Sequence, residues 1–191
     1  MGQANPANGR VPWEMCSMRM TIVPLNGVDA QLIQAIVQRL KDILPCEFEI
    51  APRCGDPEEA AGTVALNVAD LFERLHRSHQ PNQLTIGVTS CDLVAPGLDY
   101  VFGYAAPAQA AGIISLARLS NTGGDQRILA ERAAKEILHE TGHLLGLGHC
   151  GDPACVMTYS QTLQDTDNKS CSYCRRCVRE LSRLPEIIAE G

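Results

Sequence analysis

The chain has 191 residues, which is enough for one domain with a sizeable buried core. Hydrophobic residues make up 45% of it and charged residues 20%, so a disordered or fibrous protein is excluded. The formal net charge of -6 argues against nucleic acid or an anionic membrane as a partner. The sequence has no apolar run long enough to span a bilayer and no apolar signal region at its N-terminus, which predicts a cytoplasmic protein.

The first half of the chain predicts alternating strands and helices. Residues 1–19 are rich in Pro, Asn and Gly, which is typical of a flexible arm, and residues 20–191 are predicted to form the single domain. Apolar residues at helical or alternating spacing predict, in chain order, a strand at 20–25, a helix at 28–44, a strand at 46–50 and a helix at 64–78.

The second half adds three strands and a long helix. The apolar run QLTIGVT at 83–89 predicts a central strand, and LDYVFGYA (98–105) and GIISLARL (112–119) predict two more. Asp125 is a predicted N-cap for a long helix that ends near Leu145. A cysteine-rich segment and a final helix complete the chain. The order β-α-β-α-β-β-β-α indicates an α/β fold.

The stretch HETGHLLGLGHC, which begins at His139, holds three of the five histidines in the chain. His139 and His143 are four residues apart, so on a helix they share a face and can bind one metal ion. Glu140 lies beside them, where it can reach a water on that metal as a general base. Gly146 permits the left-handed conformation that ends a helix, and the reversed chain then brings His149 to the same metal.

The chemistry of such a cluster is hydrolytic. Three neutral histidines leave a zinc ion with its charge uncompensated and one coordination position open, which acidifies bound water. The five fixed positions of HExxHxxGxxH each have a geometric role. A catalytic zinc site is therefore favoured over histidines that merely take part in hydrogen bonds.

Nine cysteines are many for a chain expected in a reducing compartment, where metal ligands and buried thiols are more common than disulfides. Five of them follow the histidines closely: Cys150, Cys155, Cys171, Cys174 and Cys177. The CxxxxC of the first two, with one of the two overlapping CxxC pairs in CSYCRRC, predicts a structural zinc site with four cysteine ligands. A thiol redox site built on CSYCRRC is the alternative, although the preceding βαβ pattern of a thioredoxin-like site is missing.

The histidine motif matches the extended zinc motif of the metzincin clan of zinc metallopeptidases, which the chain therefore resembles. Metzincins have a methionine turn beneath the metal, and CVMTY places Met157 where that turn is expected. Some metzincins have a tyrosine two residues later that approaches the metal or the oxyanion. Tyr159 occupies this position here, and a packed aromatic residue is the equal alternative.

The cysteines are similar to those of the archaemetzincins, a metzincin branch with a second, structural zinc. The family spacing fits the later CxxC pair of CSYCRRC more closely than the earlier one, which leaves Cys171 spare. The resemblance therefore implies four ligands, namely Cys150, Cys155, Cys174 and Cys177. It also implies two zinc ions, one catalytic and one structural.

The resemblance implies a fold as well: a small α/β domain in which a twisted mixed sheet packs against helices, with a zinc-binding helix, a methionine turn and a C-terminal helix. An edge strand above the cleft binds substrate by strand addition in such enzymes. The segment DYVFGYAAP (99–107) is the candidate strand here.

These inferences predict a zinc metallopeptidase that acts on a peptide or protein substrate. Glu140 would activate water and then pass the proton to the leaving amine. A zinc-stabilised binding module with a vestigial or very narrow activity is the alternative. The sequence offers no acidic residue that can be assigned to a substrate amino group, so internal and terminal cleavage both stay open.

Overall fold

The structure is a computed structural model that describes residues 18–25, 27–54, 65–76, 83–120 and 124–183. Its elements are, in chain order, β1 (Arg19–Pro24), α1 (Ala30–Lys41), β2 (Glu47–Ile50), β3 (Leu66–Asn67), α2 (Val68–His76), β4 (Gln83–Thr89), β5 (Leu93–Ala95), β6 (Leu98–Val101), β7 (Gly103–Ala106), the short 3-10 helix η4 (Pro107–Gln109), β8 (Ala111–Ser115), α3 (Gln126–Leu144), α4 (Leu163–Asn168) and α5 (Arg175–Leu181). Of the predicted arm, residues 1–17 lie outside the described residues, and Arg19 begins β1.

Five strands form the main sheet in the order β2-β1-β4-β8-β7. β1 is parallel to β2 and β4, β4 is parallel to β8, and β7 runs antiparallel to β8 at the edge. All seven residues of β4 are buried, as expected for a central strand with a continuous apolar run. A smaller sheet has the order β3-β5-β6. The predicted mixed sheet is confirmed.

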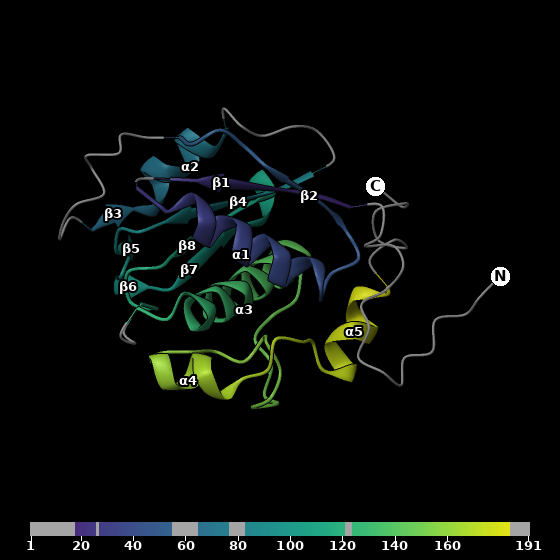
Figure 1. Ribbon diagram of the computed structural model, residues 1–191. Helices are drawn as coiled ribbons and strands as arrows, with labels where there is room; N and C mark the ends of the chain where they lie inside the picture. The colour runs from purple at the N-terminus through teal and green to yellow at the C-terminus, as the bar shows by residue number, and fades with distance from the viewer. Residues whose placement is uncertain (1–17, 26, 55–64, 77–82, 121–123, 184–191) are drawn as a thin grey trace.

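Helices cover both faces of the main sheet: α1 and α3 pack on one face and α2 on the other (Figure 1). Each face of the sheet has its own hydrophobic core, and the strands contribute side chains to both because successive side chains point to opposite faces. Met20 and Ile22 of β1 lie in the core shared with α1 and α3, whereas Val23 lies in the core shared with α2. The sheet is therefore the middle of three layers.

Aspartates cap the two long helices. Asp29 accepts a hydrogen bond of 2.9 Å from Leu32 N before α1, and Asp125 accepts one of 2.9 Å from Arg127 N before α3. The predicted N-cap at Asp125 is confirmed, and such a cap stabilises a helix by about 1 kcal/mol. None of the helices in the described part of the chain is long and apolar enough to cross a lipid bilayer.

Two predicted helices and one predicted strand differ from the observed elements. The helix predicted at 28–44 is shorter, because Asp29 caps it and the chain turns after Lys41. The helix predicted at 64–78 begins only at Val68, since the two residues before it pair with β5 as β3. The strand predicted to be half-buried at 46–50 is β2, which is mostly exposed because it lies at the sheet edge.

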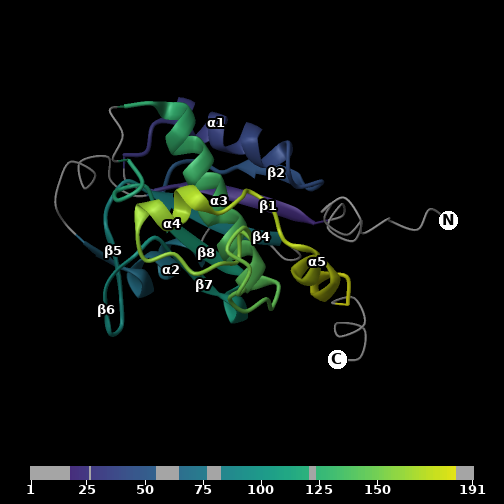
Figure 2. The ribbon, with the colours of Figure 1, turned by 90° about the horizontal axis from the view of Figure 1, so that it is seen from below.

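The other differences lie between β4 and α3. The strand predicted at 98–105 is two strands, because β6 pairs with β5 and β7 pairs with β8. The strand predicted at 112–119 ends at Ser115, whose Oγ accepts a hydrogen bond from Ala117 N as the chain turns. β5 and α4 have no counterpart among the predicted elements. Seen from below, α4 lies across α3, and a long connection leads on to α5 (Figure 2).

Candidate active site

The histidine motif occupies the end of α3 and the turn that follows it. His139 and His143 lie one turn apart on the helix. Gly146 has a φ of 85°, the left-handed conformation predicted for it, and its N–H donates a hydrogen bond of 3.0 Å to His143 O. The chain is reversed there, and His149 returns to the two helical histidines.

One ring nitrogen of each histidine lies within 4.8 Å of those of the other two. His139 Nδ1 is 2.8 Å from Val156 O and His143 Nδ1 is 2.8 Å from Leu147 O, so each Nδ1 carries a proton and donates it. The two Nε2 atoms are then acceptors that face each other at 3.1 Å. Because two lone pairs at this distance repel unless a cation lies between them, the donor set fits a metal such as zinc.

Burial favours the neutral form of His139 and of His149. Burial, followed by the positive charge of Lys169, lowers the pKa of His139 to about 3. His149 is exposed, and its partial desolvation also lowers its pKa, to which the neighbouring His143 adds. Neutral imidazole is the form that binds a metal, so the environment favours the ligand over the protonated ring.

Glu140 lies next to His139 on α3 and is only 4% exposed. Burial, followed by the charge of Glu136, raises the pKa of Glu140 well above its usual value. A metal cation held by the histidines would act in the opposite direction, because it would favour the ionised form of this carboxyl group.

The three histidines and Glu140 line a cleft of about 810 Å³. Residues of β6 and β7 and residues 159–162 also line the cleft. Tyr100 connects these two segments, since its hydroxyl donates a hydrogen bond of 2.6 Å to Gln161 O. The lining of the cleft thus includes the predicted substrate strand and the segment after the predicted methionine turn.

The structure places the predicted methionine and tyrosine at the histidine cluster. Met157 is fully buried and packs against Gly142, where an added Cβ would lie 2.9 Å from Met157 Cε. Its carbonyl accepts a hydrogen bond of 2.9 Å from Cys150 N. The ring of Tyr159 lies 4.9 Å from that of His149, is 52% exposed and faces the cleft, so it is not a packed core aromatic.

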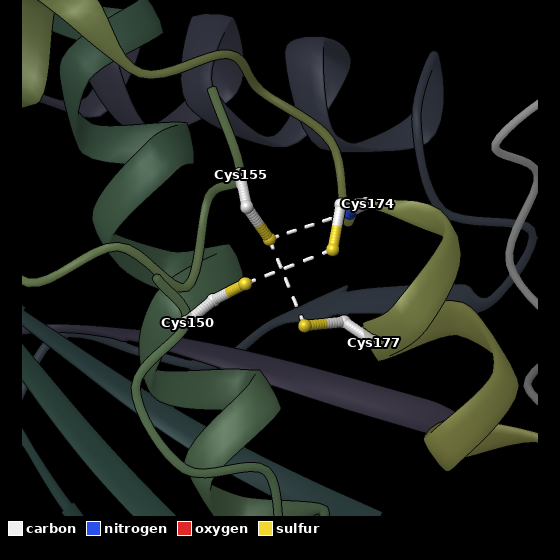
Figure 3. A group of neighbouring side chains, drawn as sticks. All are labelled: Cys150, Cys155, Cys174 and Cys177. Carbon is white, nitrogen blue, oxygen red and sulfur yellow. Dashed lines mark hydrogen bonds between the residues drawn. The ribbon is translucent and has the colours of Figure 1, made fainter. Parts of the chain in front are cut away.

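Four cysteine sulfurs point toward one another beside α5 (Figure 3). They belong to Cys150, Cys155, Cys174 and Cys177 and lie within 4.8 Å of one another. The Cys150–Cys174 and Cys155–Cys177 sulfur pairs are each 3.7 Å apart. This is far longer than a disulfide bond and close to the edge of about 3.8 Å of a tetrahedron with metal–sulfur bonds of about 2.3 Å. The structure brings together the four cysteines that the family spacing implies.

Cys171 is not part of this group of sulfurs. Burial, followed by the negative charge of Glu131, raises the pKa of the Cys171 thiol to about 12, so it stays protonated. Burial also raises the pKa of Cys155 and that of Cys177. A cation beside Cys155 and Cys177 would favour the thiolate form that burial disfavours.

Glu136 and Lys169 form a buried ion pair beside the cleft that the sequence patterns do not indicate. Lys169 Nζ lies 3.0 Å from Glu136 Oε1, and Thr166 Oγ1 donates to the same oxygen at 3.1 Å. Asp99, Glu136 and Glu140 are the charged residues that line the cleft within the described part of the chain, and all are acidic. Glu136 lies one turn before Glu140 on the helix, and this spacing could have indicated Glu136 from the sequence. No sequence pattern indicates Lys169.

The fold and the site together define the class of protein. An α/β domain whose HExxHxxGxxH helix ends at a left-handed glycine, with a methionine packed against that helix, has the architecture of the metzincin zinc metallopeptidases. The sequence profile of Peptidase family M54 matches residues 30–183. The chain belongs to this family, the archaemetzincins.

Individual relatives agree with this assignment. The archaemetzincin of Archaeoglobus fulgidus is 34% identical over 170 residues, which cover 86% of this chain and 99% of the relative. That of Pyrococcus horikoshii is 42% identical over 102 residues, so this chain spans only about half of it, 54%. The crystal structure of archaemetzincin from Methanopyrus kandleri superposes with a TM-score of 0.75 and 32% identity, covering 90% of this chain and 97% of that one. The predicted family and fold are confirmed.

Proposed function

We propose that this archaemetzincin is a zinc-dependent peptidase that hydrolyses peptide bonds in peptide or protein substrates. One feature carries the proposal: two unprotonated Nε2 atoms face each other at 3.1 Å beside a buried glutamate in a cleft. The proposed catalytic domain comprises residues 20–191. A reducing compartment such as the cytoplasm is proposed because the described cysteines form no disulfide.

The proposed ligands of the catalytic zinc are His139, His143 and His149. Zinc bound there supplies a Lewis acid that polarises a carbonyl and acidifies water. The backbone carbonyls of Val156 and Leu147 hold the first two rings in the tautomer whose Nε2 is free to bind. Three protein ligands leave room for water or substrate, which is typical of catalytic rather than structural zinc sites.

Glu140 is the proposed general base. As a carboxylate it takes a proton from the attacking water, and as an acid it gives that proton to the leaving nitrogen of the scissile bond. Burial raises the pKa of Glu140 and so makes its carboxylate a stronger base than an exposed glutamate, while a cation held by the histidines would favour the ionised form. One residue can therefore serve both proton transfers.

The substrate is proposed to lie along the cleft as an added strand. β7 is an edge strand of the main sheet and lines the cleft, and the backbone groups at the edge of a sheet can pair with an extended peptide. Tyr159, which is exposed beside His149, is proposed to contact the oxygen of the attacked carbonyl or the metal. The acidic lining of the cleft supports a peptide rather than a nucleic acid or an anionic membrane as the partner.

The second zinc is proposed to be structural, with the ligands Cys150, Cys155, Cys174 and Cys177. A zinc with four thiolate ligands has no open position and contributes to folding. Because the first cysteine directly follows His149 and the last two begin α5, this zinc would hold both ends of the loop that carries Met157. The hydrogen bond of 2.9 Å from Val156 N to Ser172 O supports the same connection.

The test of the proposed function is Glu140→Ala. Because Glu140 is not a proposed ligand, the variant should retain its metal and its thermal stability, while kcat should fall by about 10² to 10⁴, the range of general acid and base catalysis. KM should change much less, since the base acts in the transition state. Cleavage of a substrate selected from a peptide library measures this, and Glu73→Ala on the exposed side of α2 is the control. A variant that cleaves at the wild-type rate would show that Glu140 is not the general base, whereas a wild-type protein that cleaves no peptide of the library would favour the binding module.

A further inference from the structure

Gly103, the first residue of β7, lies directly against the carboxyl group of Glu140. It pairs with Ile114 of β8, and α3 packs across both strands. A Cβ added to Gly103 would lie 2.8 Å from Cγ and 2.9 Å from Cδ of Glu140, and closer still to Oε1. Real Cβ atoms essentially never approach another heavy atom within 3.0 Å. The carboxyl group therefore has its present place only because residue 103 has no side chain.

The backbone does not require glycine at this position. Positive φ angles occur in the described residues at Gly27, Gly97, Gly124, Gly146 and Ala110, and Gly103 is not among them. Glycine inside a strand weakens the strand and commonly marks a place where another group approaches closely. The group that approaches here is the Glu140 side chain, so the reason for glycine is space.

A second glycine enlarges the same space from the neighbouring strand. A Cβ on Gly112 of β8 would lie 3.4 Å from Glu140 Cβ and 3.0 Å from Ile86 Cδ1. Gly112 pairs with Ala105, two residues after Gly103. Glycines on two adjacent strands thus lie against the Glu140 side chain, Gly112 near its Cβ and Gly103 near its carboxyl group.

We propose that Gly103 is a positioning residue, which sets where the Glu140 carboxylate stands relative to the three histidines. This inference rests on the proposed role of Glu140 as the base. The atoms that an alanine methyl would meet are the flexible end of the glutamate and not backbone, so the carboxylate would move while β7 keeps its place. A displacement of about 1 Å at a reacting group can lower the rate by about 10².

The experiment compares Gly103→Ala, Glu140→Ala and the double variant. Gly103→Ala should retain its metal and lower kcat by about 10², with KM little changed. In the Glu140→Ala background the methyl has room, so Gly103→Ala should cause no further loss. Gly151→Ala is the matched control, because a Cβ there meets nothing within 4 Å and its φ is not positive. The inference is overturned if the loss of kcat in the double variant is the product of the losses in the two single variants. It is also overturned if Gly103→Ala alone has normal activity.

A second measurement does not depend on activity. In the protein that retains Glu140, Gly103→Ala should lower the Tm by about 2–4 °C. In the Glu140→Ala background the same change should leave the Tm unchanged. Equal losses of Tm in the two backgrounds would contradict the contact. If Gly103→Ala alone fails to fold but the double variant folds, the contact is supported. If Glu140→Ala keeps full activity, the proposed role of Glu140 as the base is wrong, and the Tm comparison still decides whether the contact between Gly103 and Glu140 exists.

Discussion

At the histidine cluster, the protonation of single rings decides whether a metal can bind. His139 is buried and donates through Nδ1 to Val156 O, so its Nε2 is left without a proton and faces that of His143. A proton on this nitrogen would place a positive charge in a poorly hydrated site near Lys169. The same burial that disfavours the proton therefore prepares the ring for a metal.

The burial of His139 predicts that the stability of the chelator-treated protein depends on pH. The pKa of His139 is lowered from 6.5 to about 3, so its contribution to stability is fully present above about pH 6.5 and is lost as the pH falls toward 3. The slope is at most about 1.4 kcal/mol per pH unit, or roughly 3–5 °C in Tm. Thermal unfolding of wild type and His139→Asn between pH 7.5 and 4.5 checks this. The Tm difference between them should shrink at low pH, and a constant difference would contradict the prediction.

At the scale of elements, charged side chains on α3 hold α4 in place. Arg132 forms two hydrogen bonds of 2.6 and 2.7 Å with Asp167, and Lys135 Nζ donates to Asp167 O at 3.1 Å. One turn further on, Glu136 pairs with Lys169. Because α4 lies between the segment that lines the cleft and the distal cysteines, these contacts link the zinc helix to both.

Lys169→Met tests the buried pair in this network. The change leaves the Glu136 carboxylate buried without a counter-charge, so we expect a loss of about 3–5 kcal/mol in the free energy of unfolding. The double variant Lys169→Met with Glu136→Gln should recover most of this loss, because the amide oxygen can still accept from Thr166 Oγ1. Urea unfolding of the metal-loaded proteins provides the measurement. A double variant as unstable as the single one would show that the ion pair is not the source of the loss.

The connection between the methionine loop and α5 gives a second prediction at this scale. Cys177→Ser should lose one zinc per chain and much of the thermal stability, because its sulfur belongs to the cluster of four. Cys171→Ser is the matched control in the other CxxC pair and should keep all its metal. Measurements of the zinc content and the Tm of both variants show which of the two cysteines is the ligand. The opposite result would assign the ligand to Cys171.

The whole molecule holds two ligand clusters that differ in access. The histidines line an open cleft and His149 is exposed, whereas three of the four cysteines are buried. We expect two zinc ions per chain, of which a mild chelator removes one while the protein stays folded, because only the cysteine site is coupled to folding. Metal analysis before and after dialysis measures this. A single zinc, or thiols that react with a labelling reagent in the native protein, would refute it.

Much of the architecture could be predicted because it depends on contacts close in sequence. The cap at Asp125, the buried run of β4 and the turn at Gly146 follow from side-chain chemistry within a few residues. The predictions were wrong where pairing with a distant strand decided the outcome. The single strand predicted at 98–105 is two strands because its halves belong to different sheets, and β2 is exposed because its other side has no neighbour among the described strands.

The sequence by itself determined the zinc motif, the turn that completes it and the family, because ligand spacing on one helix is a local property of the chain. Only the tertiary structure decided what surrounds these ligands. Gly103 opposes Glu140 across two elements, and Lys169 reaches Glu136 from a later segment. Such contacts are set by how the layers pack, and no periodicity along the chain encodes them.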